Sequence, residues 1–203
     1  MDKQQLILIG RQSEIENPEK MAETLYHWLV EKDIIAPGIY KEEFDRKDRY
    51  LFSNGLVHIL NEWGLDCRAQ LTGLYFETQR TMFFPRQDGG VRVVVCPFCQ
   101  QVIAGEPEAL TGSCLDWPDI HLEEDFFIYN WIDKWISEHI NLFACPLCAQ
   151  EGDINQFYFI PQWGFSNFAV IFGNGLSGIF KQDFLDELTE KVGHEIVEID
   201  YYG

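Results

Sequence analysis

The sequence predicts an α+β protein with a mixed or antiparallel sheet and about three helices. Several short runs are rich in the β-branched and aromatic residues that strands favour. Between these runs, other stretches repeat apolar residues at the three-and-four spacing of an amphipathic helix. With 203 residues, 46% of them hydrophobic, the chain has enough apolar material for one core. We therefore expect a single α+β domain over residues 1–203.

The first expected elements are a strand and a helix. Residues 6–10 form a short apolar run, which predicts the strand. Asn17 and Pro18 follow, and they supply an N-cap and a first-turn proline for the helix. The apolar face of this helix is formed by Met21, Leu25, Trp28 and Leu29.

Strands are expected again before the first pair of cysteines. Residues 50–63 fit a helix or a strand equally well. Residues 71–84 are rich in Thr, Tyr and Phe, and residues 91–95 are β-branched, so both predict strands. The Asp-Gly-Gly sequence at residues 88–90 is typical of a hairpin turn, which makes these strands antiparallel.

The second half alternates helices and strands. Residues 128–140 carry isoleucine and tryptophan at helical spacing, and residues 180–192 carry a second apolar stripe that ends at Gly193. Further strands are expected at residues 157–160, 168–172 and 195–202.

Two C-P-x-C units form the strongest motif. Cys96 and Cys99 belong to the first unit, and Cys145 and Cys148 belong to the second. Two residues between cysteines let both sulfurs of one tight turn reach a single ion, and four thiolates complete a closed, tetrahedral structural site. The motif predicts a structural zinc ion, with iron as the alternative metal. A dithiol active site or a disulfide framework would use the same residues differently.

These units resemble the paired C-P-x-C turns of zinc-ribbon and rubredoxin-type knuckle proteins. The resemblance covers residues 91–160 and implies two hairpin tips that face each other around a metal held by the four cysteines. Residues 101–144 would then form a helical insert. Such knuckles usually carry glycine after the second cysteine, where this chain has Gln100 and Ala149. Because zinc-ribbon proteins have diverse roles, the resemblance implies a metal site and no particular activity.

Negative charge is concentrated in the second half. The formal net charge is −18, and the sequence pI is about 4.5. Residues 1–99 carry 15 acids and 12 bases, whereas residues 100–203 carry 18 acids and 3 bases. This balance disfavours nucleic acid and anionic membranes as partners and favours a basic protein. The candidate partner-binding residues are Glu123, Glu124, Asp125, Asp183, Asp186, Glu187 and Glu190. A solvated surface without a partner is the alternative.

The function that follows is a zinc-stabilised acidic protein that binds a basic partner, as an inhibitor or immunity-type protein does. The alternative is an enzyme or thiol-redox protein that uses the CPFC pair or a pocket near Trp163. The sequence lacks the common phosphate-binding, zinc-protease and nucleophile-elbow motifs, so a non-enzymatic role is favoured. The apolar run at residues 6–9 is too short for a signal peptide or a membrane span, which predicts a cytoplasmic protein.

Overall fold

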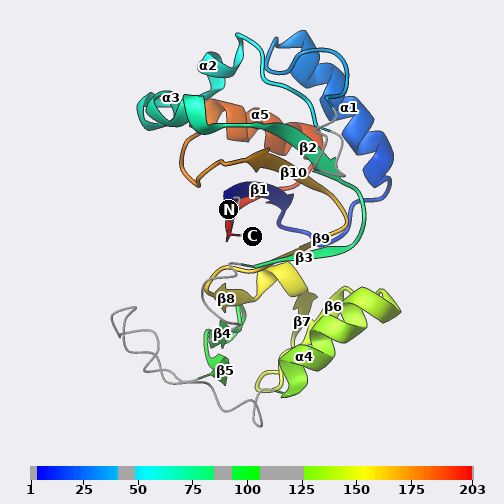
Figure 1. The fold of residues 1–203 in the computed structure, drawn as a ribbon. Coiled ribbons are helices and arrows are strands. Elements are labelled where there is room, and N and C mark those ends of the chain that lie inside the picture. Colours follow the sequence, from blue (N-terminus) through cyan, green and yellow to red (C-terminus); the bar gives the residue numbers. More distant parts are fainter. Residues whose placement is uncertain (1–3, 41–48, 85–92, 106–125, 203) are drawn as a thin grey trace.

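The computed structural model describes residues 4–40, 49–84, 93–105 and 126–202. These residues form two lobes, joined by a ribbon of two strands (Figure 1). The sheet lobe comprises the described residues of 4–77 and 169–202, and the cysteine lobe comprises 93–105 and 126–160.

The elements of the described residues are as follows. The helices are α1 (Pro18–Glu31), α2 (Leu56–Ile59), α3 (Glu62–Cys67), α4 (Phe126–Asp133) and α5 (Gln182–Val192), with short 3-10 or π turns at Arg68–Gln70 (η1), Lys134–Glu138 (η4) and Ile154–Gln156 (η5). The strands are β1 (Gln4–Gly10), β2 (Gly73–Glu77), β3 (Thr81–Phe83), β4 (Val93–Val95), β5 (Val102–Gly105), β6 (Leu142–Ala144), β7 (Glu151–Asp153), β8 (Tyr158–Ile160), β9 (Gly164–Ser166), β10 (Ala169–Gly173) and β11 (Ile196–Tyr202).

The predicted α+β class is broadly right, but the prediction of one sheet with about three helices is wrong. The described residues hold five α-helices and eleven strands, and the strands form four separate antiparallel sheets. The extra elements are short: α2 has four residues, and β3 has three. Apolar periodicity cannot be recognised over so few residues, which is why the sequence did not reveal these elements. No helix in the described ranges combines the length and apolar character needed to cross a membrane.

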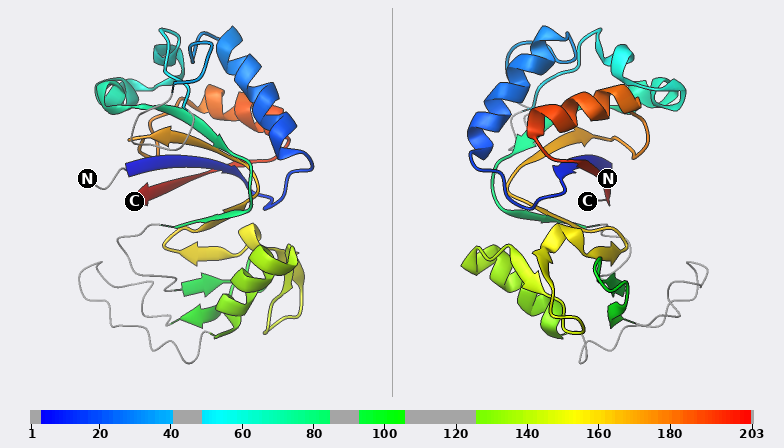
Figure 2. Two further views of the ribbon diagram at one scale, coloured as in Figure 1. Left: turned by 45° about the vertical axis from the view of Figure 1, so that its right-hand side comes forward. Right: turned by 180° about the vertical axis from the view of Figure 1, so that it is seen from behind.

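The sheet lobe has a four-stranded antiparallel sheet in the order β11-β1-β10-β2. Side chains alternate between its two faces, so Leu6 and Leu8 of β1 pack under α1 and α5, whereas Ile7 and Ile9 face the opposite side. Figure 2 shows these helices on one side of the sheet and the cysteine lobe on the other. The first and last strands are neighbours, with Gln4 opposite Tyr202.

The cysteine lobe is inserted between the two strands of the joining ribbon. The chain leaves the sheet after β2, enters the lobe through β3, and returns through β9 to β10. The ribbon passes close to the sheet at Gly164, where a Cβ atom would lie 2.1 Å from Cδ1 of Ile199. Only glycine allows this close approach without displacing the neighbouring side chain.

Polar side chains of the cysteine lobe form hydrogen bonds with the end of β1, with the loop that follows it and with β9. Buried Asn155 donates hydrogen bonds to the carbonyl oxygens of Gly10 and Phe165, and its own oxygen accepts from the N–H of Phe165 at 2.9 Å. The backbone N–H and hydroxyl of Ser13 both donate to the carboxylate of Asp153. Because these groups are partly or fully buried, separating the lobes would leave several of them without partners.

Candidate metal centre

Each C-P-x-C unit forms a tight turn directly after a strand. Cys96 follows β4, and its carbonyl accepts a 3.0 Å hydrogen bond from the N–H of Gln100. Cys145 follows β6, and its carbonyl accepts a 2.8 Å hydrogen bond from the N–H of Ala149. The two turns therefore repeat the same backbone pattern in segments far apart in the sequence.

Backbone N–H groups also point at the first sulfur of each turn. The N–H of Phe98 donates to Sγ of Cys96, and the N–H of Leu147 donates to Sγ of Cys145, each over 3.4 Å. Such hydrogen bonds stabilise a thiolate relative to a neutral thiol. Each turn is thus arranged to hold a negatively charged sulfur.

The four sulfurs converge on one point. All of them lie within 4.8 Å of one another. The Cys96 and Cys148 sulfurs are 3.9 Å apart, as are those of Cys99 and Cys145. Sulfurs placed about 2.3 Å from a central ion at the corners of a tetrahedron would be separated by about 3.8 Å. The cluster therefore has the dimensions of a four-thiolate metal site, as the sequence predicted.

Gln100 and Ala149 adopt the backbone conformation that glycine usually supplies. Their φ angles are 57° and 59°, in the left-handed region. The glycine missing from each unit is therefore replaced by a residue in the same conformation, and the turn is preserved. A non-glycine residue in this region costs roughly 1–2 kcal/mol, a cost that the surrounding hydrogen bonds offset.

The thiols differ in their environments. Cys96 and Cys145 are buried, whereas Cys99 and Cys148 are partly exposed. Burial acts to raise the pKa of Cys145, but hydrogen bonds from the N–H groups of Cys148 and Leu147, together with the sulfurs of Cys96 and Cys148, outweigh it and lower this pKa to about 7. The N–H of Gln150 favours the Cys148 thiolate, yet burial and the neighbouring sulfurs prevail and raise its pKa to about 11. The thiolate of Cys145 therefore forms more readily than that of Cys148.

Aromatic side chains pack in the apolar core that also contains the buried cysteines. The ring of Trp131 in α4 lies 5.0 Å from Phe143 and 4.9 Å from Phe157, measured between ring centroids. These rings belong to the same apolar core as Cys96 and Cys145. Helix α4, from the region predicted to be a helical insert, therefore packs against β6, the strand before the second knuckle, and against Phe157.

The predicted partner-binding carboxylates do not form one site in the described residues. Glu123, Glu124 and Asp125 lie outside those residues. The remaining four lie on α5 in the sheet lobe, where Asp183, Asp186 and Glu190 are exposed. Glu187 forms an ion pair with Lys32 of the same chain, with 2.5 Å between nitrogen and oxygen. One of the four carboxylates is therefore already engaged within the protein.

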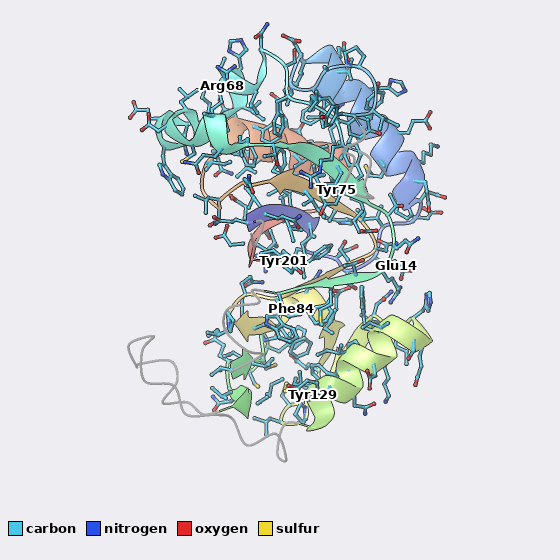
Figure 3. All side chains as sticks on the ribbon, viewed as in Figure 1. Glu14, Arg68, Tyr75, Phe84, Tyr129 and Tyr201 are labelled. Atoms are coloured by element: carbon cyan, nitrogen blue, oxygen red, sulfur yellow. The ribbon has the colours of Figure 1, made fainter. Side chains whose placement is uncertain are left out.

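An acidic groove lies at the junction of the lobes, and sequence reasoning missed it. Figure 3 shows Glu14 at this junction. The groove has a volume of about 670 Å³, and its lining contains four carboxylates and no basic side chain. It is lined by Gln12, Glu14, Glu16, Asn141, Leu142, Glu151, Gly152, Asp153 and Gln156. The two walls are more than a hundred residues apart in the chain, so no local pattern could have indicated the groove.

Two of these four carboxylates hold the groove together. Glu14 contacts Arg80, with 3.1 Å between oxygen and nitrogen, and accepts a hydrogen bond from Asn141. Burial acts to raise the pKa of Glu14, but the hydrogen bonds and the charge of Arg80 outweigh it and lower this pKa. Burial raises the pKa of Asp153, which accepts from Ser13. Exposed Glu16 and Glu151 have no ion-pair partner within the described ranges, so their charges face solvent.

Trp163, beside the pocket that the enzyme alternative requires, is a core residue. It is only 5% exposed, and its ring stacks with Phe159 at 6.3 Å between centroids.

Comparison of the chain with known proteins finds no matching family model, no similar curated protein and no similar solved structure. The functional argument consequently rests on the geometry of the cysteine cluster and on the distribution of charge.

Proposed function

We propose that Cys96, Cys99, Cys145 and Cys148 hold one zinc ion as a structural cross-link in a protein that binds a basic protein partner. The observation that carries the metal assignment is the pair of 3.9 Å sulfur contacts between the two knuckles. Four thiolates fill all the positions of a tetrahedral zinc ion and leave none for water or substrate, which favours a structural role over a catalytic one.

Metal analysis of the purified protein tests the assignment. We expect one zinc ion per chain by elemental analysis, and loss of that ion in the variant Cys99→Ser/Cys148→Ser. Cys67→Ser is the matched control, because Cys67 ends α3 in the sheet lobe, outside the cluster. A protein that is free of metal after purification under reducing conditions, and that takes up none when zinc is added, would contradict the assignment. If elemental analysis finds one iron per chain, the metal at this site is iron and the zinc assignment is wrong.

The proposed partner is a basic protein because of where the negative charge lies. Residues 100–203 hold 18 acids and 3 bases. The groove between the lobes adds support, since the side chains of Glu16, Glu151 and Leu142 in its lining are exposed. An acidic surface accelerates association with a cationic partner and confers a strong dependence on salt.

Charge-neutralising variants test the partner proposal with a lysine-rich synthetic peptide as the probe. We expect binding that weakens as salt concentration rises, and weaker binding by Glu16→Gln/Glu151→Gln. Asp186→Asn/Glu190→Gln on α5 removes the same number of charges and separates a local effect from a change in net charge. A third variant, Glu123→Gln/Glu124→Gln/Asp125→Asn, tests the acids outside the described ranges. Equal affinity for a glutamate-rich peptide would overturn the proposal.

The thiol-redox alternative uses the same cysteines and is less well supported. A dithiol active site needs one accessible, unligated thiolate. Here Cys96 is buried, and its sulfur lies 3.9 Å from Cys148 of the other knuckle. The convergence of two matching pairs is explained by one ion, whereas a single redox pair leaves the second pair without a role.

A further inference from the structure

Two contacts between cysteine sulfurs join different knuckles. Cys96 pairs with Cys148 and Cys99 pairs with Cys145, and both distances are 3.9 Å. The paired residues are 52 and 46 positions apart in the chain. The fold, through the shared apolar core of the cysteine lobe, holds these distant sulfurs side by side.

Each of these pairs combines one buried and one partly exposed sulfur. Cys96 and Cys145 are buried, whereas their neighbours Cys148 and Cys99 are partly exposed. An oxidant in solution therefore reaches the second cysteine of a knuckle first. A buried sulfur of the opposite knuckle lies 3.9 Å from each exposed sulfur and can react with it once it is oxidised.

We infer that oxidation of the metal centre by two molecules of peroxide, with two electrons lost for each disulfide, replaces the zinc ion with two disulfides across the knuckles, Cys96–Cys148 and Cys99–Cys145. This inference rests on the proposed zinc site. In each pair, the exposed thiolate attacks a peroxide oxygen, breaks the O–O bond and becomes a sulfenic acid while hydroxide leaves. The buried thiolate then attacks the sulfenic sulfur, forms the S–S bond and expels a second hydroxide.

The overall change balances. Four zinc-bound thiolates, two molecules of hydrogen peroxide and four protons give two disulfides, four molecules of water and one free zinc ion. The cysteines lose four electrons, which reduce the two peroxides. Zinc leaves because a disulfide sulfur lacks the negative charge that makes a thiolate a metal ligand.

The pairing determines what happens to the fold. Disulfides within Cys96–Cys99 and Cys145–Cys148 would release zinc and leave the two knuckles unconnected. Disulfides across the knuckles join the same two segments that the metal joined, so the cysteine lobe keeps its cross-link after zinc has left. The centre would thus release zinc under oxidation while the protein stays folded.

Tryptic mapping distinguishes the two pairings. Lys134 is the one trypsin site between residue 93 and residue 180, so cleavage there places each knuckle on a separate peptide. The experiment uses the full chain with Cys67→Ser/Cys114→Ser, which removes the cysteines outside the cluster. Zinc content is measured first, and hydrogen peroxide is then added in steps to the zinc-loaded protein and to the chelated protein.

We expect one zinc ion released for every two peroxides consumed, and the two cysteine peptides recovered as one linked species without reduction. Two separate peptides, each lighter by two hydrogens, would show pairing within each knuckle and overturn the inference. Sulfinic or sulfonic acids as the main products would also overturn it. Since the chelated protein tests pairing without zinc, a failed metal assignment and a failed pairing give different results.

Two matched variants test the pairing independently. Cys99→Ser/Cys145→Ser leaves Cys96 and Cys148, whereas Cys145→Ser/Cys148→Ser leaves Cys96 and Cys99. We expect the first variant to form an intramolecular disulfide at least several-fold faster with peroxide and to gain thermal stability from it. Faster closure in the second variant would contradict the inference. Should either variant fold poorly, the mapping of the four-cysteine protein decides alone.

Discussion

The strands of the sheet lobe have five to seven residues, whereas those of the cysteine lobe have three or four. In the sheet lobe, each long strand contributes alternate side chains to both apolar faces of one continuous sheet. The cysteine lobe has two small sheets, one long helical segment and a core rich in aromatic rings. Short strands form few ladder hydrogen bonds, so the metal cross-link that we propose at the four cysteines would contribute more to the stability of this lobe than of the sheet lobe.

Metal removal should have the largest effect, and it should destabilise the cysteine lobe more than the sheet lobe. Structural zinc contributes about 10–16 kcal/mol of apparent binding free energy in small metal-dependent folds. Chelation of the reduced protein should therefore increase amide hydrogen exchange in β4, β6 and β8, while β1 and β10 stay protected. A uniform rise in exchange over both lobes would show instead that the lobes unfold as one unit.

A core truncation in the sheet lobe should lower the stability of the protein and leave the metal site intact. Phe172 is fully buried, and its ring centroid lies 4.7 Å from that of Phe180. We expect Phe172→Ala to lower the free energy of unfolding by about 3–5 kcal/mol, because truncation removes apolar contacts and leaves a cavity. Denaturant unfolding measures this loss, and elemental analysis should still find the metal. Loss of metal in the folded variant would contradict the independence of the two lobes.

Arg80 tests the connection between the lobes. Its guanidinium donates to the carbonyl of Trp135 and to Asn141, and it lies 4.8 Å from the centre of the Trp135 ring. Arg80→Met keeps much of the volume but removes these interactions, so we expect a loss of about 2–3 kcal/mol. Hydrogen exchange should rise at the loop after β1 and at η4. Arg11→Met is a matched control, since Arg11 is exposed in its ion pair with Glu195.

Glu14 confers a smaller, pH-dependent contribution. Its folded-state pKa lies below the ordinary glutamate value of 4.5, because hydrogen bonds from Asn141 and Arg80 and the charge of Arg80 outweigh its desolvation. The stabilisation is present above that value and is lost as pH falls through the folded-state pKa. We expect Glu14→Gln to cost at most about 1 kcal/mol at neutral pH, since this carboxylate is well exposed. The cost should vanish in acid, and a constant difference at every pH would exclude the ionic mechanism.

The smallest effect is expected at the turn after the second knuckle. Ala149 has a left-handed φ of 59°. Replacement by glycine removes the steric cost, which stabilises the folded protein. It also adds backbone entropy to the unfolded chain, which offsets part of this gain, so Ala149→Gly should stabilise the protein by less than about 1 kcal/mol. Ala144→Gly in β6 is the control and should destabilise it, because Ala144 pairs in an ordinary strand. A clear loss of stability in Ala149→Gly would show that the alanine side chain has a role of its own.

Long elements could be predicted from the sequence because their patterns are local. The apolar stripes of α1 and α5 and the runs of β1 and β11 extend over seven residues or more, enough for a helical or strand period to be recognised. The metal site could be predicted for a related reason. Two cysteines separated by two residues form a tight turn in which both sulfurs can reach one ion, and the second C-P-x-C unit supplies the remaining two ligands.

Other features depended on contacts between distant residues. Elements of three or four residues, such as β7 and α2, acquire their conformation from their neighbours in the fold. Gln100 and Ala149 take a conformation that their residue types do not indicate, because the knuckle hydrogen bonds impose it. The conformations of these short segments are therefore properties of the folded lobe.

By itself, the sequence determined the α+β class, the long elements, the acidic balance of the second half and the identity of the four converging cysteines. Only the tertiary structure decided that the cysteine lobe is inserted through β3 and β9, which sulfurs are neighbours across the knuckles, and that Glu14, Glu16 and Glu151 line one groove. The physical reason is range: periodicity and motif spacing report on a few neighbouring residues, whereas these arrangements join segments 46 to more than a hundred positions apart.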